Sequence, residues 1–127
     1  MNQRDLQSLL DIYQSAELIM QYVCNVSADD FADNALLQDA VVRRLTIIGE
    51  AAGRISEKGK EALQNVEWSR IRGLRNRLVH EYDAVAIEIV WDIVQTEIEP
   101  LLKELAPVIP SENQLPTLWD NVADTET

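Results

Sequence analysis

The sequence predicts an all-α protein, an up-and-down bundle of four to five helices in a single domain. Apolar residues recur every three to four positions along four stretches of the chain, and no stretch alternates apolar and polar residues as a half-buried strand does. Glycine and proline are scarce, at four each among 127 residues, which favours a compact chain. A chain of this length has room for one core. We therefore expect one helical domain over residues 1–107.

The first two helices are predicted from their apolar stripes. Residues 6–23 carry leucine, tyrosine, methionine and valine at helical spacing. The second helix is predicted to begin at Ser27, because a serine followed by two aspartates resembles a capping box, and to continue as far as Ile55. Gly59 and its polar neighbours end this helix or mark a turn, and a weak helical turn is predicted at residues 61–64. The single cysteine, Cys24, is expected to be a buried thiol.

The other two helices follow the same logic. The third is predicted to begin near Trp68 and Ser69, and the fourth to begin after Asp83 as its N-cap, with a stripe that reaches Leu101. Pro100 should kink or break the fourth helix, because proline lacks the backbone N–H that a helix needs there. The side chains of Trp68 and of the tryptophan in the fourth helix are expected in the core.

Apolar residues beyond the main stripes predict a homodimer. They are Leu36, Ile47, Ala86, Ile89 and Ile93. A helix that is apolar on more than one face either lies at the centre of a protein or packs against another chain. A four-helix bundle of this size has no central helix, so we favour a two-fold homodimer. The alternative is a monomer with a slightly apolar surface.

Charge is unevenly distributed along the chain. The net charge is −11, but residues 43–77 carry +5, between segments of −6 and −10. The overall acidity argues against simple electrostatic capture of nucleic acid, whereas a local basic zone can still hold a phosphate. A solvated face of mixed charge is the alternative interpretation of that zone.

No apolar run reaches the roughly 20 residues of a membrane helix, and the N-terminus lacks a signal-peptide layout. We therefore expect a cytoplasmic protein without a membrane partner, and the lone cysteine agrees with a reducing compartment. Residues 108–127 form an acidic tail that is either disordered or a docking segment for a partner through Leu115, Leu118 and Trp119.

The most informative segment is residues 74–82, which contains the only histidine, His80. Arg75 lies five residues before it and Arg77 three residues before it. A group that exchanges protons near neutrality, beside fixed positive charge, suits RNA cleavage by attack of the 2′-hydroxyl on the adjacent phosphate. In that scheme His80 is general acid or base and Arg75 stabilises the phosphate charge, while Asn76 and Arg77 support them. The alternative is a surface histidine beside arginines that stabilise a helix.

Helix geometry separates these side chains. At about 100° per residue, Arg75 and His80 point about 140° apart, whereas Arg75 and Tyr82 lie nearly in line. Ile71, Leu74 and Leu78 define the core side. Either the helix loosens at His80, or the site is assembled from two subunits.

Elsewhere the chain offers one further candidate and several exclusions. Glu50 lies in an apolar segment and is spaced to pair with Arg54; it either forms that edge ion pair or orients an arginine of the third helix.

The sequence contains no cluster of histidines and cysteines of the kind that binds a metal ion, and it contains no glycine-rich phosphate loop. We therefore predict chemistry without a metal.

Residues 75–82 resemble the Arg-x4-His-x-Tyr signature of HepT-type toxins, a branch of the HEPN superfamily of small helical proteins. Arg75, His80 and Tyr82 occupy its fixed positions. Three further segments are similar to the family, namely residues 39–51, 68–71 and 89–91. Together they extend the resemblance over roughly residues 5–105.

The resemblance implies an all-helical homodimer with its active cleft at the subunit interface. It implies a metal-independent endoribonuclease that requires no cofactor, with Arg75 and His80 as the catalytic pair, and that acts as the toxin of a type VII-like toxin–antitoxin system. The implied partner is an MNT-type nucleotidyltransferase antitoxin, which consumes ATP to attach AMP to Tyr82. Phosphate added beside the arginines would occupy the place of RNA phosphate.

The chain departs from the family pattern at Glu81, where many relatives carry glycine. A carboxylate beside His80 repels RNA phosphate and favours the charged imidazole, so we expect weaker nuclease activity. Two alternatives stay open. One is a helical dimer that binds nucleotide or antitoxin without cutting RNA, which the net acidity and Glu81 favour. The other is a purely structural dimer, which leaves the arginine, histidine and tyrosine unexplained.

Overall fold

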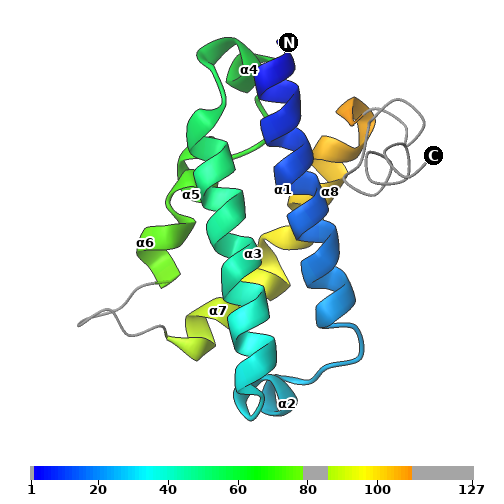
Figure 1. Ribbon diagram of the computed structural model, residues 1–127, viewed down its shortest axis with the longest axis vertical. Coiled ribbons are helices and arrows are strands. Elements are labelled where there is room, and N and C mark those ends of the chain that lie inside the picture. The colour runs from blue at the N-terminus through cyan, green and yellow to red at the C-terminus, as the bar shows by residue number, and fades with distance from the viewer. Residues whose placement is uncertain (1, 79–85, 110–127) are drawn as a thin grey trace, which may run out of the picture.

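Two long antiparallel helices form the frame of the protein. The computed structural model describes residues 2–78 and 86–109. Helices α1 (Gln3–Tyr22) and α3 (Ala35–Arg54) lie side by side along the long axis (Figure 1), joined at one end through the short α2 (Ala28–Ala32). Helix α4 (Glu57–Ala62) follows α3 at the other end. The described residues contain helices and no strand, which confirms the all-α prediction.

The second half of the chain packs across this frame in shorter pieces. Helices α5 (Trp68–Arg72) and α6 (Leu74–Leu78) pack against α3. Helix α7 (Ile87–Thr96) contacts α2 and α3, and α8 (Ile98–Leu105) packs against α1 before a 3₁₀ turn at Ala106–Val108. Helix α3 therefore contacts most of the other helices, and it positions α5 and α6.

The core follows the predicted stripe in α3 and only part of the predicted stripe in α1, where Tyr13 and Met20 are half-buried. In α1 the side chains of Leu9, Ile12, Ala16 and Ile19 are fully buried, at the three- and four-residue spacing of one helix face. The facing stripe of α3 is equally buried and consists of Val41, Leu45, Ile48 and Ala52. Full burial of a leucine or isoleucine stabilises the fold by roughly 1.5–3 kcal/mol relative to exposure. The close packing of α1 on α3 is thus the main apolar contribution to the frame.

Of the five extra apolar residues, only Leu36 is strongly exposed, at 82%. Ile93 is fully buried, and Ile47, Ala86 and Ile89 are half-buried. Much of the surplus apolar surface is therefore covered within one chain. The homodimer stays a prediction.

The helix predicted from Ser27 to Ile55 is two helices, so that prediction is wrong in its continuity. The Ser27 hydroxyl accepts a hydrogen bond from the Asp30 N–H, as the capping box predicted. The chain then breaks, and the Asn34 side chain caps α3 by accepting from the Leu37 N–H at 3.0 Å. The Gln38 side-chain amide donates to two carbonyls at the end of α2, which stabilises the break.

Four other boundaries differ from the prediction or refine it. Helix α3 ends at Arg54, and the weak turn predicted at residues 61–64 is instead α4, which begins at Glu57 because Ser56 caps it. The third predicted helix is broken at Gly73 into α5 and α6. Helix α7 begins after Ala86 as its N-cap, so the prediction of Asp83 as the cap is wrong; Asp83 itself lies outside the described residues.

The predicted effect of Pro100 is confirmed, and the break falls upstream of the proline. Helix α7 ends at Thr96 and α8 begins at Ile98, which leaves Pro100 in the first turn of α8. Proline is tolerated there because the first N–H groups of a helix have no partner within it. Glu97 occupies the junction.

Two predictions about single side chains have opposite outcomes. Trp68 is buried, as predicted, and Trp91 is partly buried with its ring 5.0 Å from that of Phe31. The prediction for Cys24 is wrong, because this thiol is exposed. Helix α1 ends at Tyr22, and Asn25 adopts a left-handed φ of 59° that turns the chain away from the stripe.

No helix within residues 2–78 and 86–109 combines the length and the apolar character needed to cross a bilayer. The acidic tail predicted from residue 108 lies outside the described residues from residue 110 onward.

Candidate active site

Helix α6 presents the first half of the predicted catalytic segment. Leu74 and Leu78 are buried, at 0% and 2% exposure, and Ile71 just before them is buried too, which confirms the predicted core side. Between these anchors Arg75 and Asn76 are exposed. A five-residue helix is unstable by itself, so packing on α3 must determine where it points. The core thus directs Arg75 and Asn76 toward solvent.

Gly49 allows this close packing. A Cβ atom built at Gly49 would lie 3.6 Å from the Ile71 carbonyl oxygen and 3.8 Å from the Arg75 backbone nitrogen. These are ordinary contacts for a Cβ, but a longer side chain would meet backbone on the opposite helix. The position in the apolar segment of α3 therefore needs a small residue so that the backbone of α5 and α6 can approach.

Arg77 lies in an ion cluster rather than beside Arg75. Its Nη1 is 3.3 Å from the Glu97 Oε1, and the Arg70 Nε donates to the same oxygen. The Glu97 side chain is only 11% exposed. We call Arg70, Arg77 and Glu97 the arginine clamp, because it joins α5 and α6 to the α7–α8 junction. Arg77 was predicted as a supporting site residue. In the structure it forms an ion pair with Glu97 that links α6 to the α7–α8 junction.

Glu50 does not form the predicted pair with Arg54. The Arg54 Nη2 is instead 3.5 Å from the Asp11 Oδ2 on α1. Glu50 is exposed and takes part in no ion pair or side-chain hydrogen bond within the residues that the structure describes. The i,i+4 spacing allows a pair between Glu50 and Arg54, but the Arg54 guanidinium pairs with the Asp11 carboxylate on α1 instead.

His80, Glu81 and Tyr82 lie outside the described residues. Their positions relative to Arg75 therefore stay predictions, as does the choice between a loosened helix and a site shared by two subunits. In the part of the chain that is described, no three histidine, cysteine, aspartate or glutamate side chains gather as metal ligands would.

A basic groove lies beside Asn76, and sequence reasoning missed most of its residues. We call it the α5 groove; it has a volume of about 320 Å³. It is lined by Lys60, Trp68, Ser69, Arg72, Gly73 and Asn76. The only sequence signal for it was the net positive charge of residues 43–77, which did not say which bases share a surface.

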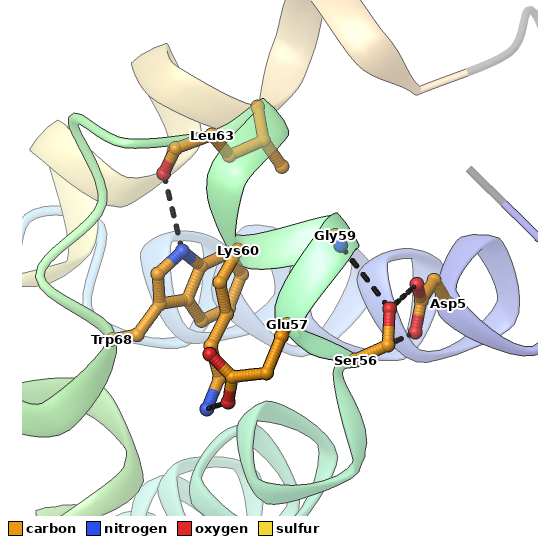
Figure 2. A network of polar contacts seen from close by, with 7 residues as sticks. All are labelled: Asp5, Ser56, Glu57, Gly59, Lys60, Leu63 and Trp68. Carbon is orange, nitrogen blue, oxygen red and sulfur yellow. Dashed lines mark hydrogen bonds and ion pairs between the residues drawn. The ribbon is translucent and has the colours of Figure 1, made fainter.

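A buried polar cluster at the far side of α4 was also missed (Figure 2). Asp5 is 1% exposed, and its carboxylate accepts hydrogen bonds from the Ser56 N–H, at 2.9 Å, and from the Ser56 hydroxyl. The Ser56 hydroxyl oxygen in turn accepts from the Gly59 N–H at 3.1 Å. Hydrogen bonds from the Ser56 side chain and backbone hold the pKa of Asp5 below its ordinary value of 3.8.

Comparison with known proteins gives a consistent result. The family model described as "Ribonuclease HepT-like" matches residues 12–108. A protein of Methanocaldococcus jannaschii named "Putative RNase MJ1380" is 34% identical over 106 residues, which cover 83% of this chain and 97% of that protein. "Putative RNase TTE0752" of Caldanaerobacter subterraneus is 35% identical over 101 residues, covering 80% and 90%. "Probable ribonuclease HepT" of Thermococcus cleftensis is 32% identical over 93 residues, covering 73% and 84%. No solved structure matches the chain.

Proposed function

The chain belongs to the HepT-like ribonuclease family, and from that premise we propose that it is an endoribonuclease toxin that cleaves RNA without a metal ion. One observation carries the proposal. Arg75 is exposed on a helix anchored by buried leucines, five residues before the only histidine of the sequence, within the region that the family model matches. An exposed guanidinium held on an anchored helix is well suited to bind phosphate oxygens.

The proposed reaction needs two proton transfers and one site of positive charge. A base removes the proton of the RNA 2′-hydroxyl, whose oxygen attacks the adjacent phosphorus. The bond to the 5′-oxygen breaks, and an acid gives that oxygen a proton, which leaves a 2′,3′-cyclic phosphate and a 5′-hydroxyl. His80 supplies one of the two proton transfers, and Arg75 stabilises the charge that builds up on the phosphate oxygens.

We further propose that the protein acts as a homodimer, with the site at the interface. One histidine in each chain cannot be acid and base in the same step, whereas two subunits bring two histidines. The exposed Leu36 and the half-buried Ile47 on α3 are apolar residues that a second chain can cover. The mass of the protein in solution tests this part directly.

The partner that we propose is an MNT-type nucleotidyltransferase antitoxin. It transfers AMP from ATP to the phenolic oxygen of Tyr82, the phenolic proton is lost, and pyrophosphate leaves. The new phosphodiester brings negative charge and bulk to the segment that follows Arg75, where it competes with RNA phosphate. This pairing makes the chain the toxin of a type VII-like system.

The deciding experiment is cleavage of RNA by the purified protein in excess EDTA. We expect the Arg75→Ala and His80→Ala variants each to lose roughly 100-fold or more of the cleavage rate, because each removes a group that acts on the transition state. Lys58→Gln is the control, since Lys58 is an exposed base on α4. Cleavage that required added divalent metal, or that survived both substitutions, contradicts the proposed mechanism.

A separate measurement tests the control by the antitoxin. The intact mass of the protein, taken after incubation with antitoxin and ATP, should rise by one or more AMP units, and Tyr82→Phe should abolish the increase. An unchanged mass in a pair that still neutralises the toxin contradicts this part alone.

A second function is favoured by the net charge of −11 and by Glu81, both of which disfavour RNA. It is a helical dimer that binds nucleotide or antitoxin and cuts nothing. Tight binding of the antitoxin by a protein without any ribonuclease activity would support it.

A further inference from the structure

The α5 groove combines hydrogen-bond donors of the kinds that bind phosphate. Arg72 offers a planar guanidinium fork, Lys60 an ammonium group, Asn76 a side-chain amide and Ser69 a hydroxyl. They come from three helices, α4, α5 and α6, so the folded chain brings them together. The indole ring of Trp68 forms a fixed wall, because it is buried and its Nε1 donates to the Leu63 carbonyl at 3.1 Å (Figure 2).

The Arg72 side chain lies across the last turns of α3. A Cβ atom built at Gly53 would be 3.8 Å from the Arg72 Nε and 4.0 Å from its Cγ. These are ordinary contact distances, so the Arg72 side chain packs against α3 at Gly53. The end of a helix carries partial negative charge, which favours a guanidinium there. Arg72 is consequently held beside the groove, while its side chain remains exposed.

The nearby ion pair leaves Lys60 accessible to a ligand. Its Nζ is 3.6 Å from the Glu57 Oε1, and the Glu57 side chain is 87% exposed. Such a surface pair contributes little to stability, so a phosphate can replace the carboxylate at small cost.

A second hollow, also lined in part by residues of α5, differs from the α5 groove in charge. It has a volume of about 340 Å³ and is lined in part by Glu67, Glu97 and Glu104, and its arginine, Arg70, is already bound to Glu97. Three carboxylates repel a phosphate, whereas none of the described residues that line the α5 groove is acidic. Of the two hollows, only the α5 groove has the positive charge that binding of an RNA backbone requires.

We propose that the α5 groove binds a backbone phosphate of the RNA next to the one that is cleaved, with Arg72 as its main ligand and Lys60 and Asn76 as additional donors. This inference rests on the proposed function. Asn76 follows Arg75 directly in the same short helix. The groove and the exposed Arg75 can therefore bind neighbouring phosphates of one RNA strand. The groove thus adds substrate affinity without taking part in bond breaking.

The test uses the full chain with the His80→Ala substitution, so that RNA is bound and not cut. Affinity for a labelled single-stranded RNA is measured by fluorescence anisotropy over a range of salt concentrations. Arg72→Gln should weaken binding about tenfold, as expected for loss of one charge-assisted hydrogen-bonding group, and should lower the slope of log affinity against log salt by about 0.7. Lys60→Gln should do the same to a smaller extent.

Lys58→Gln is the matched control, because it removes one positive charge from the same helix as Lys60 without touching the groove. It should change affinity less than twofold. Circular dichroism verifies that each variant is folded. In the protein with His80 intact, Arg72→Gln should raise KM about tenfold and change kcat much less.

The outcomes separate the two proposals. If RNA is bound and cut but Arg72→Gln has the affinity and salt slope of its parent, the groove proposal is wrong and the ribonuclease stands. An equal loss from Lys58→Gln also contradicts the groove, since it would indicate a diffuse charge effect. If the parent neither binds nor cuts RNA, both proposals fail.

Discussion

The two sides of α4 show polar residues used in opposite ways. On one side Asp5 is buried, and both of its carboxylate oxygens accept hydrogen bonds from Ser56 (Figure 2). On the other side Arg72 and Asn76 line the α5 groove; both are exposed, and within the described residues neither forms an ion pair. The first cluster is saturated by the protein itself and so has no capacity for a ligand. The second keeps its donors available, and it is there that we expect RNA.

In this fold a structural polar cluster has its donors and acceptors paired within the protein, whereas a candidate site leaves them exposed to solvent. The arginine clamp lies between the two cases, because Glu97 is nearly buried while Arg70 and Arg77 are partly exposed. Substitutions should therefore divide into those that lower the free energy of unfolding and those that lower RNA cleavage or binding.

Asp5→Ala should have the largest effect, a loss of roughly 3 kcal/mol in the free energy of unfolding. The substitution removes an ionised acceptor of two hydrogen bonds at a buried position, and each such bond contributes about 1.5–3 kcal/mol. Chemical denaturation measures the loss. Asp11→Ala is the control, since Asp11 pairs with Arg54 at the surface and should cost less than about 1 kcal/mol. Equal losses of unfolding free energy from Asp5→Ala and Asp11→Ala would contradict a special role for the buried Asp5.

Gly59→Ala should destabilise by about 2 kcal/mol. The new Cβ would be 2.8 Å from the Asp5 Oδ2 and from the Ile55 Cγ2, so a packed neighbour must move, at a cost of roughly 1–3 kcal/mol. Gly53→Ala is a control of opposite sign. It is a helical position whose nearest neighbouring atom would be 3.8 Å away, and alanine there should stabilise by about 0.5–1 kcal/mol. If Gly59→Ala left the free energy of unfolding unchanged, the Asp5 side chain would have to be free to move away from position 59.

Acid should erase part of the Asp5 contribution. Because folding lowers the pKa of Asp5 below 3.8, the ionised carboxylate stabilises the fold above that value, and this stabilisation is lost as the pH falls through the folded pKa. The gap in unfolding free energy between the unsubstituted protein and Asp5→Ala should thus be constant near neutrality and should shrink below about pH 4. A gap that widened toward low pH would reverse the sign of the argument.

Glu97→Ala should cost about 1 kcal/mol. It leaves two arginines without their shared acceptor, but both are exposed enough for water and salt to compensate much of the loss. High salt should reduce the effect, as seen in denaturation at two ionic strengths. Glu99→Ala, an exposed acid on α8, serves as the comparison and should be nearly silent.

Arg75→Ala should have the smallest effect on stability, within about 0.5 kcal/mol, because it is an exposed side chain. Its large effect should appear only in RNA cleavage. A thermal unfolding curve recorded beside the cleavage assay makes the distinction. A marked loss of stability would indicate that Arg75 has a structural role like that of Arg77.

Local sequence patterns predicted most of the helices, but they could not predict contacts between residues far apart in the sequence. The burial of Leu9, the Ser27 cap and the break near Pro100 all depend on neighbours in sequence, and all are found. The exposure of Cys24 was missed, because a left-handed residue such as Asn25, which turns the chain just after α1, has no periodic signal. The breaks at Asn34 and Gly73 were missed because the apolar stripes continue across them.

The candidate site was predicted in part. Arg75 and Asn76 were identified by their distance from His80 and by the family signature, and the structure shows them exposed. The partner of Arg77 could not be predicted, since Glu97 is twenty residues away and carries no motif. The pairing of Asp5 with Ser56 spans 51 residues, and only the folded chain brings them together. Likewise, Lys60 and Arg72 become neighbours of one groove only when α4 packs beside α5.

The arginine clamp has a consequence for protein engineering. Residues 74–82 look like a portable unit, short enough to move into another helical scaffold. Helix α6, however, is held through Arg77 by Glu97, which lies at the α7–α8 junction near Pro100. A transplant of the motif alone would leave Arg77 without its counter-charge and α6 without that tether. A designer would have to carry over an acidic residue in the place of Glu97, so the smallest transferable unit is discontinuous in sequence.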